Sequence, residues 1–532
     1  MHCKKLFRPS LPFSLLLLFT TSAIAQSTSP SSQDAAQSQP SQPQQDQRID
    51  LLQQKLQELQ AEIDALKLAN AVNKTELHNT TAKASAPPAA AASASATAPS
   101  QAAPASDPHD PHSEPFAFAD FSWLNGNART IDTPYATEFF TPEIRADVNY
   151  TYDFRHPQDD TISGSSEVFR SSEVQVTQLG VGGDFHHNDV RARVMTQFGL
   201  YSETTPRNDA SPARGQWNLA DAYRYLSEAY GGYHFHVQHG INLDAGIFMS
   251  YVGLFSYYQF DNWAYQPSYV SSNTPWFFNG VRLQWYPTAK LKIEPWFING
   301  WQSYGRFNNR PGYGGQILYR PNGKFEILGN QYAFGRDALG VTGRTRYHTD
   351  DSIEYKFYDQ HLSTGISKSA LTLTGDAGCE TGGGVSCFGN GKSGPKQSFL
   401  GFMLYNRTWF DRDRFALTLG GGRINNPGRY LVLLPPINGA TAASGTPYFT
   451  ENPGDQFKAW DASSTFDYMP SQYFTYRLEY NHRAANVPYF SGPGGVTPPG
   501  GNQGAPGSVV PGWQPDLRNS ENRITGALLV KF

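Results

Sequence analysis

Apolar and polar residues alternate along the final eleven residues of the chain, NRITGALLVKF at 522–532. Ile524, Leu528 and Val530 fall on one face of this segment, and Arg523 falls on the other. Successive side chains of an extended chain point to opposite sides. The pattern therefore predicts a β-strand with one apolar face and one mostly polar face.

The same alternation appears at 144–154 (IRADVNYTYDF), where Ile144 and Val148 lie opposite Arg145 and Asp147. Eleven residues is about the length that a tilted strand needs to cross the hydrocarbon layer of a membrane. Further strands are predicted at 173–185, 190–200, 223–237, 241–250, 279–286, 290–299, 314–320, 324–332, 351–358, 366–375, 397–407, 414–423, 457–468 and 473–482. Together with 522–532 they predict about sixteen strands, within a range of roughly 14–18.

The predicted connections alternate in length without a break. Tight ones such as 187–188 and 322–323 are followed by long ones such as 201–222 and 424–456. Short turns at one end and long loops at the other are typical of an outer-membrane β-barrel, whereas a soluble β-sandwich has no reason to sort its loops. The predicted fold class is therefore all-β, a transmembrane antiparallel β-barrel.

This barrel is expected to occupy residues 116–532 of the chain. Its final strand descends from a long loop, so both ends of the barrel face the periplasm. We expect Phe532 to lie at the periplasmic interface and to act as the signal that the barrel-assembly machinery reads, with outer-membrane lipid around the wall. Whether residues 116–140 add a strand or pack inside the pore is left open.

Composition agrees with this class. Aromatic residues make up 14% of the chain, which also contains 49 Gly and 37 Pro. Such a mixture suits many strands, aromatic girdles and long loops. A formal net charge of -4 argues against a strongly basic nucleic-acid-binding protein.

The N-terminus predicts export. Lys4, Lys5 and Arg8 precede a short apolar run, and Ala23-Ile24-Ala25 matches a small-x-small cleavage site, so residues 1–25 are predicted to be a signal peptide. Residues 26–47 are rich in Ser, Gln and Pro and are predicted to be disordered. Residues 74–115 are predicted to be a linker that is largely Ala, Pro and Ser.

Between these segments, residues 48–73 predict a short coiled-coil helix in the periplasm. Ile49, Leu52, Leu56 and Leu59 fall on alternating three- and four-residue steps, and the pattern continues for about three heptads. The alternative is a single amphipathic helix lying on a partner. The narrow apolar stripe favours self-association.

Two cysteines remain after signal cleavage, Cys379 and Cys387, in the Gly-rich stretch CETGGGVSC. In an oxidising compartment two cysteines this close in a loop predict a disulfide. A metal site would need two further ligands nearby, and the sequence offers none. No Ser/His/Asp spacing or phosphate-binding loop is evident, so we predict no catalytic residues, no metal and no cofactor.

A barrel of about sixteen strands leaves an aqueous channel, so the polar faces of its strands are expected to line water. The pore-lining candidates are Arg191, Arg193, Arg282, Lys290, Lys292, Glu294, Arg477, Glu479 and Asn481. The alternative is that each of these residues only binds water and stabilises the barrel wall. The loop at 251–278 is too rich in aromatic residues for a water-exposed loop, and we expect it to fold into the lumen or against a neighbouring subunit.

Four segments of the chain resemble the OmpL-like β-barrel porin family of Gram-negative outer membranes. They are LDAGIFMSYVG (243–253), FINGWQ (297–302), GGQILYRPNGKFEILGNQYAFG (314–335) and YRLEYNHR (476–483). The resemblance implies passive diffusion through the barrel. The coiled coil is similar to that of some trimeric porins and implies a homotrimer.

Two functions remain open at this point. The first is a porin that lets small hydrophilic solutes diffuse through a water-filled channel. The second is a barrel that serves as a surface scaffold, adhesin or receptor through its long loops.

Overall fold

The computed structural model describes Lys55 and most of the chain from residue 113 to residue 532. Within the latter range it leaves out residues 210, 212–213, 251, 307–309, 335–342, 390–393, 429–432, 434, 436, 441–443, 450–451, 453 and 503–504, and the side chain of Asn208. The predicted signal peptide, the disordered segment, the coiled coil apart from Lys55 and nearly all of the linker lie outside the described residues.

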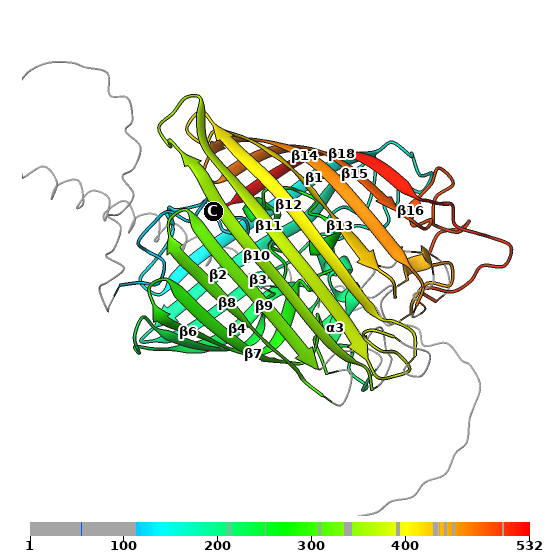
Figure 1. Ribbon diagram of the computed structural model, residues 1–532, viewed down its shortest axis with the longest axis horizontal. Coiled ribbons are helices and arrows are strands. Elements are labelled where there is room, and N and C mark those ends of the chain that lie inside the picture. The colour runs from blue at the N-terminus through cyan, green and yellow to red at the C-terminus, as the bar shows by residue number, and fades with distance from the viewer. Residues whose placement is uncertain are drawn as a thin grey trace, which may run out of the picture. The chain divides into compact units, whose positions relative to one another are not determined.

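The described residues form a closed antiparallel barrel of sixteen strands (Figure 1). The strands are β1 (Phe140–Asp153), β2 (Val174–His187), β3 (Val190–Thr196), β4 (Leu226–Phe235), β5 (Ile241–Met249), β6 (Phe277–Thr288), β7 (Leu291–Ile298), β8 (Gly312–Asn322), β9 (Phe325–Phe334), β10 (Thr345–Asp359), β11 (Ile366–Thr381), β12 (Ser398–Phe410), β13 (Phe415–Asn426), β14 (Phe457–Ser471), β15 (Phe474–Ala485) and β18 (Ser520–Lys531). The predicted fold class and strand number are confirmed. Closure follows from β18 pairing with β1, which leaves no edge strand exposed.

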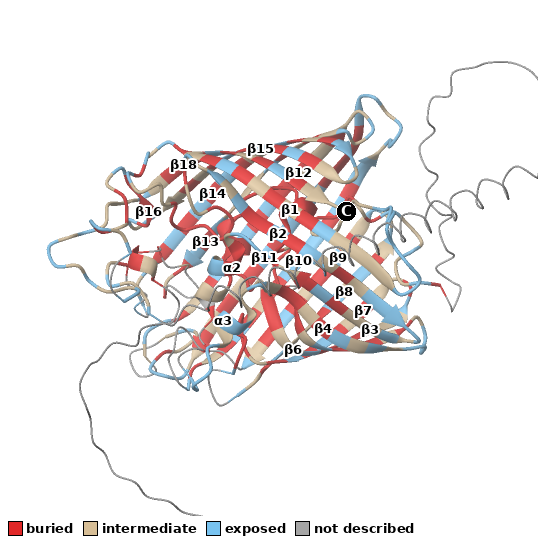
Figure 2. Cartoon of the chain, turned by 180° about the vertical axis from the view of Figure 1, so that it is seen from behind, coloured by how far each residue is buried: buried red, intermediate tan, exposed pale blue. Residues whose placement is uncertain are grey.

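Each strand has one face outside the barrel and one inside, as the alternation predicted. On β18, Ile524 and Leu528 are 38% and 42% exposed, whereas Arg523 and Thr525 are 0% exposed. The bands of buried and exposed residues along the strands in Figure 2 show the same alternation. Apolar residues therefore face outward and polar residues face the lumen, which is the arrangement that a lipid surround requires.

Short turns gather at one end of the barrel and long loops at the other. The turn between β2 and β3 places Asn188 (φ 46°) and Asp189 (φ 67°) in the left-handed region. Two such residues match the twist of a tight hairpin, and Asn and Asp tolerate this conformation better than most residues. The C-terminus lies at the short-turn end, opposite the small sheet of β16 (Phe490–Ser491) and β17 (Leu517–Arg518) (Figure 1).

The helices are short and lie in the connections. They are α2 (Tyr201–Thr204), α3 (Leu219–Tyr223), α4 (Tyr269–Ser272) and the 3-10 turns η1 (Pro206–Asn208), η3 (Gln259–Asp261) and η4 (Ile437–Gly439). Across the part of the chain that is described, no helix has both the length and the apolar character needed to span a membrane.

Several strands are longer than the sequence predicted, and β10 and β11 extend furthest beyond their predicted ranges. β10 begins at Thr345 rather than at 351, and β11 continues to Thr381 rather than stopping at 375. The outward positions in these extensions include Thr349 on β10 and Ala377 on β11, which are not large apolar residues. The alternation of large apolar and polar residues is therefore interrupted there, although the backbone continues to pair.

Candidate pore

The loop between β5 and β6 turns inward and occupies the middle of the barrel. We call its described residues, 252–276, the inner loop. Trp263, Tyr265 and Tyr269 are at most 3% exposed, although they belong to a loop. Of the two locations expected for this aromatic segment, the lumen is the one observed. Burial inside the barrel accounts for so many rings in a connection between strands.

The inner loop is attached to the barrel wall at β15. The Glu479 carboxylate accepts hydrogen bonds from the backbone N–H groups of Tyr265 (2.6 Å) and Gln266 (2.9 Å). Arg477, on the same inward face, donates to the carbonyl of Asn262 (2.6 Å). Buried polar groups are costly without partners, so the strand and the loop satisfy each other. The β15 side chains therefore hold the inner loop in place.

The inner loop also reaches other walls of the barrel. The Tyr258 hydroxyl donates to Glu228 on β4 (2.7 Å), and Arg145 on β1 forms an ion pair with Asp261 (3.0 Å). Burial and the Glu228 carboxylate raise the pKa of Tyr258 well above its usual value, so the hydroxyl keeps its proton and donates. The loop thus bridges β1, β4 and β15 and narrows the lumen.

A second segment, residues 113–132, crosses the short-turn end of the barrel, and we call it the plug segment. The Phe116 N–H donates to the carbonyl of Ala289, between β6 and β7 (2.8 Å). The Trp123 indole donates to the carbonyl of Gly323, between β8 and β9 (3.1 Å). These partners lie in turns of the barrel wall, so this part of the unassigned segment packs inside the barrel and does not add a strand.

The plug segment and the inner loop contact each other. The Trp263 indole donates to the carbonyl of Trp123 (3.0 Å), and the Gly126 N–H donates to the carbonyl of Asp261 (2.9 Å). Arg129 donates to backbone carbonyls at the start of β15 and the end of β14. Burial lowers the pKa of Arg129 to about 10, because removal from water disfavours its charged form.

On the wall formed by β1 to β4, Arg193 is the centre of a charge cluster. Its guanidinium lies 2.6 Å from Glu228, 2.7 Å from Asp184 and 3.1 Å from Glu143. The Asp184 side chain remains 46% exposed, whereas that of Glu228 is 8% exposed. Glu143 also pairs with Arg145, so three carboxylates and two guanidinium groups meet on this wall.

The cluster continues along the neighbouring strands. Asp244 on β5 pairs with Arg191 (3.3 Å) and with Arg282 (3.0 Å), and Lys292 pairs with Glu294 on β7 (2.9 Å). The Arg191 side chain is 28% exposed, and those of Arg282 and Glu294 are 4% and 0% exposed. Solvent therefore reaches this wall at Arg191. The other charged side chains of these strands are buried and form ion pairs.

The nine residues proposed to line a pore fall into two groups in the structure. Arg191, Arg193, Arg282, Lys290, Lys292 and Glu294 belong to β3, β6, β7 and the turn between β6 and β7; Arg477, Glu479 and Asn481 belong to β15. All nine except Lys290, a turn residue, lie on inward faces. The β15 group is buried against the inner loop, and Lys290 lies over the Phe118 ring of the plug segment (5.4 Å).

Several charged residues on the inward faces of the strands were absent from the sequence-based set. They are Glu143, Arg145, Asp184, Glu228, Asp244, Asp461 and Asp467. Each occupies an inward position of a predicted or observed strand, so the alternation that selected the nine could also have selected these. No local signal pairs them, because their partners lie on other strands or in the inner loop.

The two cysteines form a disulfide with an S–S distance of 2.07 Å. Cys379 lies near the outer end of β11 and not in the loop as expected, because β11 extends to Thr381. At the other end of the barrel, Phe532 directly follows β18 and lies against the start of β1.

The histidines near the turn between β4 and β5 form hydrogen bonds with neighbouring groups. His239 donates a hydrogen bond to the carbonyl of Ser113 (3.0 Å), and His234 is hydrogen-bonded to Asn242 (2.7 Å). Among the residues that the structure describes, no three His, Cys, Asp or Glu side chains gather as metal ligands would.

The chain is similar to a known protein family and to several solved structures. The family model described as "Putative beta-barrel porin-2, OmpL-like" matches residues 145–510. A search of curated proteins found no match. Similar solved structures include the outer membrane channel DcaP of Acinetobacter baumannii, at 13% identity over 77% of this chain and 100% of that chain, with a TM-score of 0.41.

Two further solved structures give similar values. An anion-selective porin from Comamonas acidovorans is 9% identical over 74% of this chain and 99% of that chain, with a TM-score of 0.44. Pseudomonas putida OprB is 10% identical over 74% of this chain and 94% of that chain, with a TM-score of 0.42. Because the family model matches well over half of the chain, and the fold is a closed sixteen-stranded barrel, the chain belongs to the OmpL-like family of outer-membrane β-barrel porins.

Proposed function

We propose that the barrel is a channel for passive diffusion of small hydrophilic solutes across the outer membrane. The observation that carries this proposal is a closed wall with an apolar outer face and a charged inner face. In a sixteen-stranded barrel the inner face surrounds a lumen wider than the side chains of the wall alone fill. Membership of a porin family supports the same function.

The charged wall of β2 to β7 is the part of the lumen that we assign to solute contact. Arg191 and Asp184 keep solvent exposure there, and Arg193, Arg282 and Glu294 lie behind them. Fixed charges of both signs along a narrow passage bias which ions and solutes pass. In this proposal Arg477, Glu479 and Asn481 contribute indirectly, because they hold the inner loop and have little contact with solvent.

The inner loop and the plug segment set an upper limit on solute size in this proposal. One crosses the middle of the lumen, and the other crosses its short-turn end. Both are held by hydrogen bonds to the wall. Only small solutes are expected to pass while both segments are in place.

We also propose that the chain works as a homotrimer, with residues 48–73 forming a periplasmic coiled coil. Its signal peptide, linker and coiled coil would then have the boundaries predicted in the sequence. Support comes from the heptad pattern and from the position of residue 113 at the short-turn end, which faces the periplasm in the predicted orientation. Catalysis, metal binding and nucleic-acid binding are not part of this proposal.

The deciding experiment is conductance of the purified full chain in a planar lipid bilayer. We expect discrete single-channel steps that increase with salt concentration. A folded, heat-modifiable barrel that never opens would contradict the porin proposal. That result would favour the surface scaffold, adhesin or receptor function for the long loops.

A further inference from the structure

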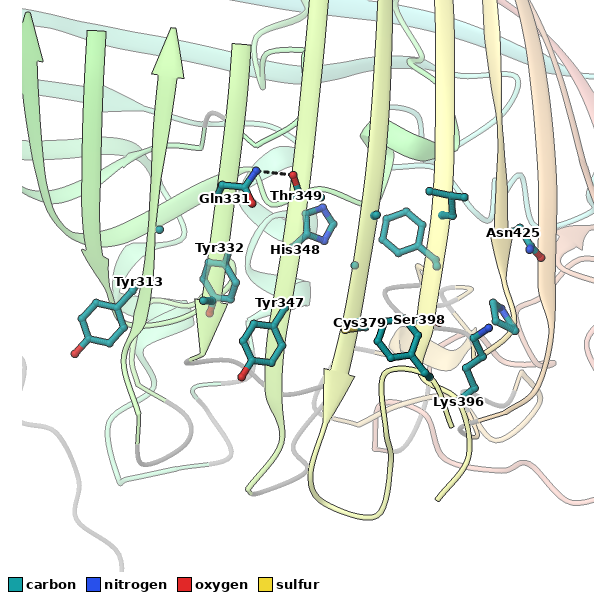
Figure 3. A pocket seen from close by; sticks show the side chains of 18 residues that line it. Tyr313, Gln331, Tyr332, Tyr347, His348, Thr349, Cys379, Lys396, Ser398 and Asn425 are labelled. Atoms are coloured by element: carbon teal, nitrogen blue, oxygen red, sulfur yellow. Dashed lines mark hydrogen bonds between the residues drawn. The ribbon is translucent and has the colours of Figure 1, made fainter. Parts of the chain in front are cut away.

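The outer surface of the barrel wall carries a groove over β8 to β13, near the long-loop end (Figure 3). Its volume is about 690 Å³, within the range of roughly 300–1,000 Å³ typical of sites that hold a small organic ligand. Tyr313 and Tyr347 line it on one side, and Leu400 and Phe388 line it on the other. The last two are 64% and 84% exposed, so the groove has apolar walls open to the outside.

Strand pairing shows that the floor of this groove belongs to the outward face. Gln331, Thr349, Ala377, Leu400 and Asn425 lie side by side on five successive strands. Their neighbours in sequence point the other way and are buried inside the barrel. Small side chains at several outward positions leave space for the groove between the larger side chains at its two sides.

Gln331 and Thr349 in the floor begin a hydrogen-bonded row that continues to Asp351, beside the groove on the same outward face. The Gln331 amide donates to the Thr349 hydroxyl (2.5 Å), which donates to the Asp351 carboxylate (2.8 Å). Asp351 faces Gly329 and Gly375 on the neighbouring strands, so no large side chain covers it. Polar groups facing hydrocarbon are unfavourable, and a carboxylate there calls for a partner that supplies hydrogen-bond donors.

Three cations lie at the outer rim beside the groove. Lys396 lines the groove itself, Arg423 points outward from β13, and Lys458 points outward from β14. In the strand pairing, Lys458 is opposite Asn425, and Arg423 is opposite Trp460. None of the three cations has an ion pair with an acidic side chain among the described residues. Unpaired cations at this level of an outer-membrane barrel favour an anionic head group.

The loop that carries Phe388 and Lys396 is braced over the groove. The Cys379–Cys387 disulfide ties its start to β11, next to Phe388. The Ser386 N–H donates to the carbonyl of Pro395 (3.1 Å), which holds the two arms of the loop together. Phe388 and Lys396 are therefore positioned by the fold, at opposite arms of the same loop.

We propose that this groove binds a phosphate-bearing amphiphile of the outer leaflet. The phosphate would bind Lys396, Arg423 and Lys458, and an acyl chain would lie along Tyr347, Leu400 and Phe388. Hydroxyl or amide groups of the head would donate to the Gln331–Thr349–Asp351 row. A second copy of the chain is a poorer occupant, because docking by the same face would bring the two sets of cations together.

Native mass spectrometry of the purified full chain with lipopolysaccharide in detergent tests this proposal. We expect one retained lipid for each barrel, and much weaker retention of zwitterionic phosphatidylethanolamine. The triple variant Lys396→Glu, Arg423→Glu, Lys458→Glu should bind lipopolysaccharide at least about tenfold more weakly, since it loses the charge-assisted contacts to phosphate and puts negative charges in their place.

A second variant, Ala377→Trp, fills the groove and leaves the three cations in place. It should also lose binding, which separates a built groove from general attraction to positive charge. The matched control is Lys324→Glu, Arg412→Glu, Arg414→Glu, which makes the same charge change on exposed residues of the short-turn end. Heat-modifiable migration checks that every variant is folded.

The proposal is overturned if the groove-side triple variant binds lipopolysaccharide as tightly as the control does. It is also overturned if Ala377→Trp retains full binding of lipopolysaccharide, or if the wild-type barrel retains no lipopolysaccharide and Ala377→Trp instead reduces the number of copies of the chain in the complex. Channel conductance is not a readout of this experiment, so its outcome is independent of the porin proposal.

Discussion

Phe532 and Ile144 close the barrel by exchanging backbone hydrogen bonds: the Phe532 N–H donates to the Ile144 carbonyl (3.0 Å), and the Ile144 N–H donates to the Phe532 carbonyl (3.3 Å). The Phe532 ring also stacks on Tyr473 from the turn between β14 and β15, with ring centroids 5.5 Å apart. Phe532 thus contacts β1 and the turn that leads into β15.

The first prediction concerns this closure. Phe532→Asp places a charge at the seam and removes the ring contact with Tyr473, so most of the protein should fail to assemble. The readout is the amount of heat-modifiable barrel in the outer membrane. Phe357→Asp is the control, because Phe357 is an outward aromatic residue of β10 away from the seam. Equal assembly of the two variants would contradict a special role for the C-terminal residue.

The second prediction concerns the anchor of the inner loop. Glu479→Ala leaves the N–H groups of Tyr265 and Gln266 without their acceptor, at a cost of about 1–3 kcal/mol for each buried group. The loop should loosen, and single-channel conductance should become larger and noisier. Leu478→Ala changes the adjacent lipid-facing residue and should leave conductance unaltered. If Glu479→Ala conducts like the parent chain, the loop does not limit the passage.

The third prediction concerns ion selectivity. Arg191→Glu inverts the most solvent-exposed guanidinium of the charged wall, beside Asp244. The reversal potential in a salt gradient should shift toward cation preference, with a change of about twofold or more in the permeability ratio. Arg414→Glu, in an exposed turn, is the matched charge change. If Arg191→Glu and Arg414→Glu change ion selectivity equally, Arg191 does not lie on the path of the solutes.

The fourth prediction concerns the plug segment. Trp123→Ala removes a side chain that is 2% exposed and its hydrogen bond to Gly323. The segment should detach more often, so conductance should rise and protease should cut near residue 123 more quickly. Ser122→Ala, one residue earlier, is the control. Unchanged cleavage and conductance would show that the plug is held without Trp123.

The fifth prediction concerns assembly of subunits. A chain lacking residues 48–73 should give fewer crosslinked trimers than the full chain, because the heptad segment is proposed to join the subunits. The segment 26–47 before it and the linker 74–115 after it stay, so the barrel itself should still fold. An unchanged crosslinking pattern would show that another surface holds the oligomer together.

The number and faces of the strands were predictable because alternation is a local property. The pattern around Ile524 and Arg523 is visible in a few consecutive residues, and so is the length of each connection. Where outward residues become small or polar, as at Thr349 and Ala377, the same method underestimated the strands. The strands continue there because the backbone N–H and C=O groups bond to the neighbouring strand, and this bonding does not depend on the side chain.

The candidate pore was predicted less completely. Alternation assigns Arg477 and Glu479 to the inside of the barrel but does not say what they meet there. Their partners come from the inner loop, more than two hundred residues earlier in the chain. A residue assigned to the lumen is therefore solvent-facing, as Arg191 partly is, or paired within the wall, as Lys292 is with Glu294, or bonded to a loop. Only the folded arrangement separates these cases.

By itself the sequence determined an outer-membrane barrel of about sixteen strands, its apolar outside and its polar inside, because period-two patterning and loop length are written in neighbouring residues. Tertiary structure decided what occupies the lumen and which charges remain open to solvent. Those outcomes depend on contacts between segments far apart in the chain, such as Trp123 with Trp263 and Tyr265 with Glu479. No local pattern encodes such pairs, because each needs the closed wall to bring its two partners together.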